Sequence, residues 1–390
     1  MVISVHCVRG RPKSKPSVLT SSGRSSVFDF GIRPPDALAA KYRSAGVWRD
    51  SGPLSDLRRW RDETPEGVAV RAYRSGVQPE QVSYAEFAGR VERFAGALYE
   101  LEVRPGDVVA LQLPNLWQTS ALMLAVARLG AMLVSITTGI VARELEQVLD
   151  RVGASVCITV DRWSGFGHAG ALREMAPRLP WLRHRVVLGG LASEDEIEFG
   201  SFFEDTRWEQ CHPVALDDAH EDPDRVAVVC FTAGPSGEPM GVLHTWNTLH
   251  ARSSGWAGAG RPGRPDVVFT PHDLMNVTGN LALLSSLLTG GCVVLLDDWS
   301  GENGLALLAE TGATVFLAAP AFVDDMITAA RGRPQHLQAL RTVLCGATAV
   351  TNRLVREVRC VFGIPLGPAW SMTDVGIGDP VVPRGCGRPG

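Results

Sequence analysis

Hydrophobic and polar positions along the chain follow two different periodicities. Short, mostly apolar runs predict strands that are buried on both faces. These runs stand at residues 68–73, 108–113, 132–136 and 156–160. Residues 85–101 instead place Phe87, Val91, Phe94 and Leu98 at spacings of three and four, which predicts an amphipathic helix. Further helices are expected at 36–45, 54–61, 118–129 and 143–151. Strands that alternate with helices indicate a parallel sheet covered on both faces.

The same alternation returns after Asp224. Strands are expected at 226–231, 267–270, 293–296, 315–318 and 342–344. Helices are expected at 280–288, 304–310, 322–330 and 352–362. The segment 189–223 is acidic and irregular, and we interpret it as the link between two α/β layers. The fold class is therefore α/β, with one subdomain at residues 35–223 and a second at 224–376.

Composition narrows the possible functions. The net charge of −4 over 390 residues shows no excess of positive charge of the kind that favours nucleic-acid binding. The longest apolar stretch, 121–136, contains Arg128 and Gly130, so no membrane span is expected. The eight scattered cysteines form no CxxC pair and are typical of free thiols in a reducing cytoplasm. Residues 1–34, basic and Ser-rich at the start, are expected to be a disordered leader, and no lysine follows Lys41.

A loop rich in glycine and hydroxyl side chains follows the strand expected at 226–231. Its sequence is Thr232-Ala233-Gly234-Pro235-Ser236-Gly237-Glu238-Pro239-Met240-Gly241. Such a loop can offer backbone N–H groups and hydroxyls to phosphate oxygens, although composition alone is equally compatible with a plain turn. It is not a Walker A loop, because the Gly-Lys-Ser/Thr ending is absent.

This loop resembles the Thr-Ser-Gly-Thr-Thr-Gly-x-Pro-Lys-Gly phosphate loop of the adenylate-forming superfamily, which includes acyl-CoA synthetases, peptide-synthetase adenylation domains and luciferases. Other segments match motifs of that superfamily in the expected order. They are residues 82–87, 104–115, 125–131, 344–349, 369–376 and 385–390. The chain is identified as a member from about Leu54 to Gly390. Asp298-Trp299 and Gly363-Ile364-Pro365 resemble the cyclohexanecarboxylate and medium-chain acyl-CoA ligases most.

The resemblance implies an AMP-forming acyl-CoA ligase. Mg·ATP and a carboxylic acid would give an acyl-adenylate and pyrophosphate, and CoA would then attack the adenylate. The implied fold has two stacked doubly wound sheets, a small β-barrel subdomain and a C-terminal domain. The barrel is expected to be incomplete, begun only at residues 377–390, and the C-terminal domain is expected to be absent, so the CoA site would be incomplete.

The resemblance also assigns roles to residues. The implied nucleotide-binding residues are Thr232, Ala233, Gly234, Pro235, Ser236, Gly237, Met240, Gly346, Ala347, Thr348, Trp370, Ser371 and Thr373. Thr232, Thr373 and Asp374 are the implied catalytic residues, and Asp374 would hold Mg²⁺. The implied substrate pocket contains Trp246, Asn276, Gly279 and Ser371. His272, close to Asn276, is expected to be a surface residue.

Several positions depart from the superfamily pattern. Met240 replaces the lysine of the loop, which removes a charged hydrogen-bond partner worth roughly 1.5–3 kcal/mol. Pro235 replaces a threonine, so a hydroxyl and a backbone donor are lost together. These changes, with the missing C-terminal domain, predict that the isolated chain is impaired or inactive as a ligase.

Two alternatives stay open. The chain could be one half of a split ligase whose C-terminal domain is supplied by a separate chain. It could instead be a non-catalytic nucleotide-binding or scaffold protein. A dinucleotide oxidoreductase is disfavoured, since no Gly-x-Gly-x-x-Gly follows an early strand. A cytoplasmic location is expected for each alternative.

Overall fold

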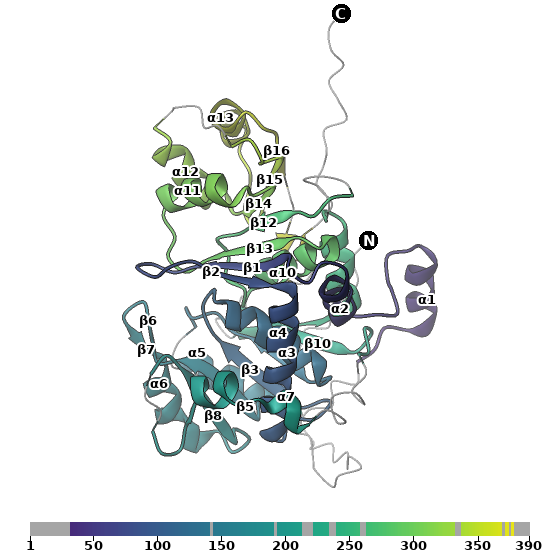
Figure 1. The fold of residues 1–390 in the computed structure, drawn as a ribbon, viewed down its shortest axis with the longest axis vertical. Helices are drawn as coiled ribbons and strands as arrows, with labels where there is room; N and C mark the ends of the chain where they lie inside the picture. Colours follow the sequence, from purple (N-terminus) through teal and green to yellow (C-terminus); the bar gives the residue numbers. More distant parts are fainter. Residues whose placement is uncertain are drawn as a thin grey trace, which may run out of the picture.

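The computed structural model describes residues 32–140, 143–190, 193–212, 221–233, 239–257, 263–331, 337–368, 371–373 and 376–377. These residues form two seven-stranded sheets that lie one above the other with helices between them and on their outer faces (Figure 1). The expected α/β fold with two stacked, doubly wound sheets is confirmed.

The first sheet has the strand order β11-β10-β4-β3-β5-β8-β9. All neighbours pair in parallel except β10 and β11, which form an antiparallel hairpin. The strands are β3 (Val108–Gln112), β4 (Met132–Ser135), β5 (Val156–Val160), β8 (His184–Leu188), β9 (Ile197–Glu198), β10 (Val226–Ala233) and β11 (Pro239–Thr245).

The second sheet has the strand order β16-β15-β14-β12-β13-β1-β2, with only the β1–β2 pair antiparallel among the described strands. The strands are β1 (Val68–Tyr73), β2 (Glu80–Ser83), β12 (Val267–Phe269), β13 (Cys292–Leu296), β14 (Val315–Ala318), β15 (Thr342–Cys345) and β16 (Leu366–Pro368). Two short hairpins complete the described strands: β6 (Arg162–Trp163) with β7 (Phe166–Gly167), and β17 (Ser371–Met372) with β18 (Gly376–Ile377).

Helices cover both faces of each sheet. The layer between the sheets contains α2 (Pro53–Glu63), α3 (Tyr84–Glu100), α4 (Trp117–Arg128), α9 (Trp246–Ser254) and α10 (Val277–Thr289). The outer face of the first sheet is covered by α5 (Arg143–Val152) and α6 (His168–Met175). The outer face of the second is covered by α11 (Gly301–Thr311), α12 (Pro320–Ala329) and α13 (Asn352–Phe362).

The alternating direction of side chains along each strand explains this arrangement of layers. In β3, Val109 points into the core between the sheets, whereas Val108 points into the outer core beneath α5. In β14, Val315 and Phe316 divide in the same way between the central core and the outer core beneath α12. Because successive side chains of a strand point to opposite faces, a fully apolar strand requires cover on both sides.

The domain boundary expected at residue 224 does not separate the two sheets. β1 and β2 precede that boundary but belong to the second sheet, and β10 and β11 follow it but belong to the first. The segment 189–223 is also more than an irregular link. It contributes the edge strand β9, a π-helix at Gly200–Asp205 and helix α7 (Trp208–Cys211), both of which lie against α3.

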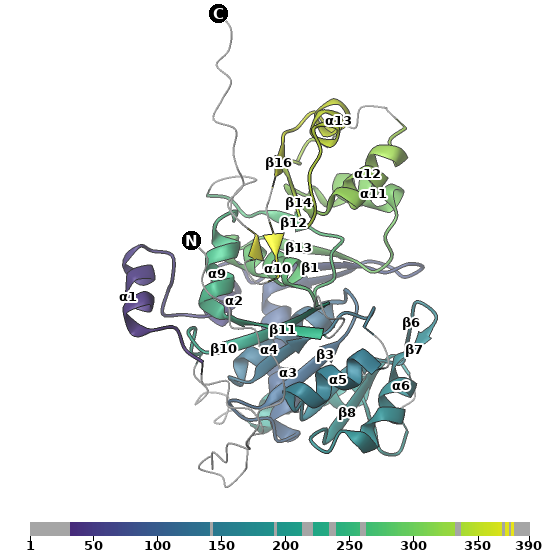
Figure 2. The ribbon, with the colours of Figure 1, turned by 180° about the vertical axis from the view of Figure 1, so that it is seen from behind.

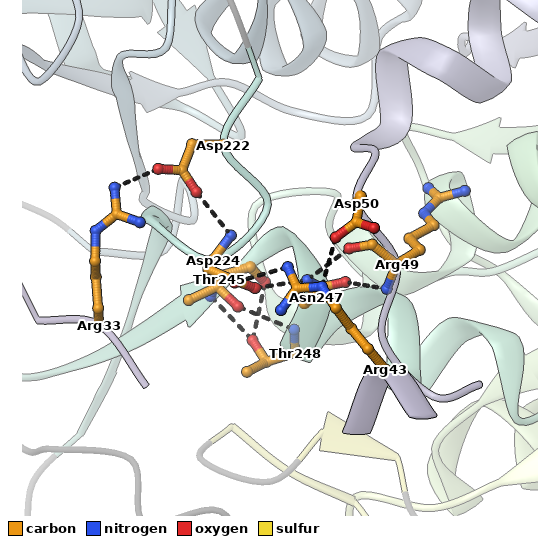
Figure 3. Close-up of polar contacts among 9 residues, drawn as sticks. All are labelled: Arg33, Arg43, Arg49, Asp50, Asp222, Asp224, Thr245, Asn247 and Thr248. Atoms are coloured by element: carbon orange, nitrogen blue, oxygen red, sulfur yellow. Dashed lines mark hydrogen bonds and ion pairs between the residues drawn. The ribbon is translucent and has the colours of Figure 1, made fainter. Parts of the chain in front are cut away.

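An N-terminal arm at residues 32–50 includes α1 (Asp36–Ser44) and lies beside the start of β10 (Figure 1). Polar contacts attach it, as Figure 3 shows: Arg33 pairs with Asp222, and Arg43 pairs with Asp224 at 2.7 Å. The amide of Asn247, on α9, donates to Asp224 at 2.7 Å and to the carbonyl of Arg49 at 2.9 Å. The arm is therefore fixed to α9 and to the strand that leads to the predicted phosphate loop. The leader expected at residues 1–34 lies outside the described residues up to residue 31.

Candidate functional site

The carboxyl ends of the parallel strands define where a ligand can bind. Ligands of open α/β sheets bind beyond these ends, at the point where successive connections leave in opposite directions. In the second sheet this point lies between β12 and β14, because the chain runs from β12 to β13 on one side and from β14 to β15 on the other. The rings of His272, which follows β12, and Phe322, on α12 just after β14, lie there with centroids 5.3 Å apart.

Buried polar side chains join the carboxyl edges of the two sheets. Asn115, which follows β3, donates to the carbonyls of His272 at 3.1 Å and Leu296 at 3.2 Å. Its side-chain oxygen accepts from the backbone N–H of Leu274 at 2.8 Å. The hydroxyl of Ser135, at the end of β4, donates to the Met275 carbonyl at 2.9 Å. Segment 270–276 is therefore shared by both sheet edges.

The predicted phosphate loop connects β10 to β11. Residues 234–238, which include Gly234, Pro235, Ser236 and Gly237, lie outside the described residues. The flanking register is clear, since Thr232 pairs with Met240 and Ala233 with Pro239. Met240, where the superfamily has lysine, is half-buried. A Cβ on Gly241 would contact Phe231 and Val229 on the outer face, so by alternation Met240 and His244 point to the opposite face.

Residues 369–376, which include the predicted nucleotide-binding Trp370 and the predicted Mg²⁺ ligand Asp374, overlap the hairpin β17–β18, whose strand β18 lies against α9 and α10 (Figure 2). Trp370 and Asp374 lie outside the described residues. The backbone carbonyl of Thr373 lies 3.0 Å from Nε2 of His244, which is buried on β11. The structure therefore brings the strand that follows the predicted phosphate loop into contact with the segment that carries Thr373.

The Gly346–Thr348 turn follows β15 at the same edge of the second sheet. The N–H of Gly346 donates to the Ala318 carbonyl at 3.2 Å, which places the turn beside the end of β14. Ala347 has φ +71°, in the left-handed region that costs a residue with a side chain roughly 1–2 kcal/mol. Ala347 and Thr348 are exposed, so they are accessible to a ligand at this edge, as the nucleotide-binding prediction requires.

The predicted pocket residues lie at two different places. Asn276 caps α10, because its side-chain oxygen accepts from the N–H of Gly279 at 2.9 Å. A Cβ on Gly279 would overlap the Asp273 carbonyl, so close packing requires glycine there. Trp246 is buried on α9 and lines a small cavity with Arg49, Asp56, His250, Leu284 and Leu288. That cavity borders the second half of α10, roughly 12 Å or more along the helix from Asn276.

His272 is half-buried at the carboxyl edge of the second sheet, rather than exposed at the surface as the sequence analysis expected. Segment 270–276 is held by hydrogen bonds to Asn115 and Ser135 at the edge of the first sheet. Burial lowers the pKa of His272 to about 4. Burial likewise raises the pKa of the neighbouring Asp273. At neutral pH the imidazole is neutral and can act as a hydrogen-bond donor or acceptor at the switch point. Sequence reasoning missed it because a single histidine carries no spacing signal.

The described residues give little support for a cysteine nucleophile, a metal cluster or a membrane-spanning helix. Cys157, Cys230, Cys292 and Cys345 are buried free thiols, and Cys211 and Cys360 are exposed. Burial raises the pKa of Cys157 and Cys230 to about 12, so neither is a nucleophile at neutral pH. Within the described ranges, no cluster of His, Cys, Asp and Glu could hold a metal, and no helix is long and apolar enough to cross a membrane.

Known proteins resemble this chain over most of its length. It is 28% identical over 351 residues to the 2-hydroxy-7-methoxy-5-methyl-1-naphthoate–CoA ligase of Streptomyces carzinostaticus, covering 87% of this chain and 61% of that protein. It is 29% identical to a salicyl-AMP ligase of Mycobacterium tuberculosis, covering 91% and 63%. It is 26% identical to the medium-chain fatty-acid–CoA ligase of Escherichia coli, covering 82% and 55%. The chain thus spans about 60% of the length of these relatives.

Solved structures share the fold. The apo structure of Mycobacterium smegmatis MbtA superposes with a TM-score of 0.75 at 24% identity, over 87% of this chain and 60% of that chain. The anthranilate CoA ligase AuaEII, in complex with anthranoyl-AMP, superposes with a TM-score of 0.73 at 18% identity, over 84% and 60%. Residues 57–388 match the family described as AMP-binding enzyme. This chain therefore belongs to the AMP-binding enzyme family.

Proposed function

We propose that the chain binds ATP and a carboxylic acid at the carboxyl edge of the second sheet and joins them as an acyl-adenylate. The observation that carries the proposal is the contact between His244 on β11 and Thr373, because β11 begins at the end of the predicted phosphate loop and Thr373 is a predicted nucleotide-binding residue. In the proposed site, loop 232–237 and Thr373 bind phosphate oxygens, Trp370 stacks on adenine, and Asp374 is the Mg²⁺ ligand.

Several described residues support this proposal. In the Gly346–Thr348 turn, Gly346 is buried, whereas Ala347 and Thr348 are exposed at the carboxyl edge of the second sheet, beside the end of β14. Met240 and His244 lie on one face of β11, the face on which His244 contacts the Thr373 carbonyl. A phosphate group could be bound by backbone N–H groups and hydroxyls without a lysine, although one charged partner is lost at position 240.

For the acid, we propose an aromatic or medium-chain carboxylic acid. The names of the relatives support this choice, because they include naphthoate, salicylate and medium-chain fatty-acid ligases. Asn276 and Gly279, at the start of α10, are the proposed pocket residues of this chain. We propose CoA as the acyl acceptor for the complete reaction.

The test is acid-dependent exchange of labelled pyrophosphate into ATP, measured with salicylate, 1-naphthoate, benzoate and octanoate. Adenylate formation predicts exchange that requires both Mg²⁺ and one of these acids, and that falls at least tenfold in Asp374→Asn. A folded chain that binds ATP but gives no exchange with any acid would contradict adenylation. That result would favour the second candidate, a non-catalytic nucleotide-binding protein, which the half-buried Met240 supports.

A further inference from the structure

His244 is a buried imidazole that no motif of the sequence analysis includes. Its side chain is 3% exposed, and its Nε2 lies 3.0 Å from the backbone carbonyl oxygen of Thr373. A carbonyl oxygen can only accept a hydrogen bond, so Nε2 carries the proton and donates it. The tautomer of His244 is thereby defined by the segment that the proposed nucleotide site uses.

The backbone of His244 is fixed on both sides. Within the β10–β11 hairpin, at the edge of the first sheet, it pairs with Val228, next to a register irregularity between Val226 and Val228. The next residue, Thr245, caps α9: its hydroxyl accepts from the N–H of Thr248 at 3.1 Å, and the Thr248 hydroxyl accepts from the N–H of Thr245 at 3.0 Å. Figure 3 shows this pair of threonines beside Asn247. The backbone that carries the imidazole is therefore held by its pairing with β10 and by the cap of α9.

The described part of the segment that receives this hydrogen bond is a short pair of strands. Among its described residues, Ser371 pairs with Ile377 and Met372 with Gly376. An isolated two-stranded hairpin is marginally stable at best in water, so contacts outside the hairpin must fix its position. Helices α9 and α10 lie against β18 and supply packing (Figure 2). The His244 hydrogen bond adds a directional contact at Thr373, next to the proposed metal ligand Asp374.

We propose that His244 is a positioning residue of the nucleotide site. By donating a hydrogen bond to the Thr373 carbonyl, it sets the position of Thr373 relative to β11, the strand that begins at the end of the predicted phosphate loop. The inference rests on the proposed function, and it assigns His244 no direct contact with substrate.

Two variants separate positioning from general stability. His244→Gln keeps an N–H donor near the position of Nε2, and His244→Leu removes the donor while filling a similar volume. Ser253→Ala is the matched control, since it removes a buried hydrogen bond to the Leu249 carbonyl within helix α9 and leaves the hydrogen bond between His244 and Thr373 in place. Each protein is measured by hydrogen exchange of peptides that span 371–377 and by the affinity for Mg·ATP.

The expected result is a selective loss in His244→Leu. Exchange in 371–377 rises and the affinity for Mg·ATP falls about tenfold, which corresponds to about 1.4 kcal/mol. His244→Gln stays within about threefold of the wild type, and Ser253→Ala leaves both measurements unchanged. Equal behaviour of the Leu and Gln variants, with ATP binding intact in the wild type, would overturn the role of His244 alone. Absence of Mg·ATP binding in the folded wild type would overturn the proposed function, and the positioning role with it.

Discussion

Replacing Asn115 tests whether the two sheet edges are joined through segment 270–276. Asn115 is 3% exposed and makes three hydrogen bonds to backbone groups of His272, Leu274 and Leu296. Each bond contributes about 1 kcal/mol net, and a buried N–H left without a partner costs about 1–3 kcal/mol. Asn115→Ala leaves the N–H of the fully buried Leu274 without this partner, so we expect a loss of about 3–5 kcal/mol in the free energy of unfolding.

Urea unfolding followed by tryptophan fluorescence measures this loss. The matched control is Asn303→Ala, because Asn303 is exposed and its side-chain amide lies 3.4 Å from the Asp298 carbonyl. We expect the control to stay within about 0.5 kcal/mol of the wild type. A loss below about 1 kcal/mol in Asn115→Ala, with an unchanged dependence on urea, would refute the claim that this side chain joins the sheets.

Three further predictions follow from single residues. The pKa of His272 is lowered from 6.5 to about 4, so the unfolded chain binds a proton first as the pH falls. The stability that comes from keeping the His272 imidazole neutral is present above pH 6.5 and is lost between pH 6.5 and 4. In urea titrations, His272→Gln should reduce this acid-induced loss of unfolding free energy by up to about 3 kcal/mol. An unchanged loss in the variant would contradict the claim that burial lowers the pKa of His272. Gly279→Ala should lower the free energy of unfolding by at least about 2 kcal/mol, because the new Cβ would overlap the Asp273 carbonyl. Gly89→Ala, at a position of α3 with open space around it, should raise it by about 0.5–1 kcal/mol. Similar urea midpoints for the two variants would show that the close packing of Gly279 on Asp273 does not require glycine. If position 240 lies beside the bound phosphates, Met240→Lys should raise the rate of pyrophosphate exchange about tenfold or more. Val77→Lys, at an exposed loop position, should not change this rate. Equal rates in the two variants would exclude phosphate binding by position 240.

Local periodicity predicted most of the secondary structure. The helix 352–362 and the strands 156–160 and 315–318 have the bounds that the apolar pattern predicts, because side-chain burial alternates with the local backbone period. Sheet membership could not be predicted in this way. That β1 joins β13 rather than β3 depends on pairing between residues more than 200 positions apart, such as Val70 with Val293.

The candidate site was predictable only in part. Motif resemblance located the segments around Met240, Gly346 and Thr373, and the structure places all three at strand ends or in a hairpin beside β11. The roles of Asn115 and His244 depend on contacts across 129 to 181 residues of sequence, so neither spacing nor composition could indicate them. Trp246 was predicted to line the substrate pocket. In the structure it lines a cavity beside the second half of α10, and its role in substrate binding stays a prediction.

The most direct test of the proposed nucleotide site is calorimetric titration of the folded chain with a non-hydrolysable acyl-adenylate analogue, such as salicyl-sulfamoyl adenosine. We predict saturable one-to-one binding that weakens at least tenfold in Trp370→Ala, because stacking on the adenine is lost. Absence of heat up to millimolar analogue, or equal affinity in Trp370→Ala, would contradict an adenylate site at this edge of the sheet.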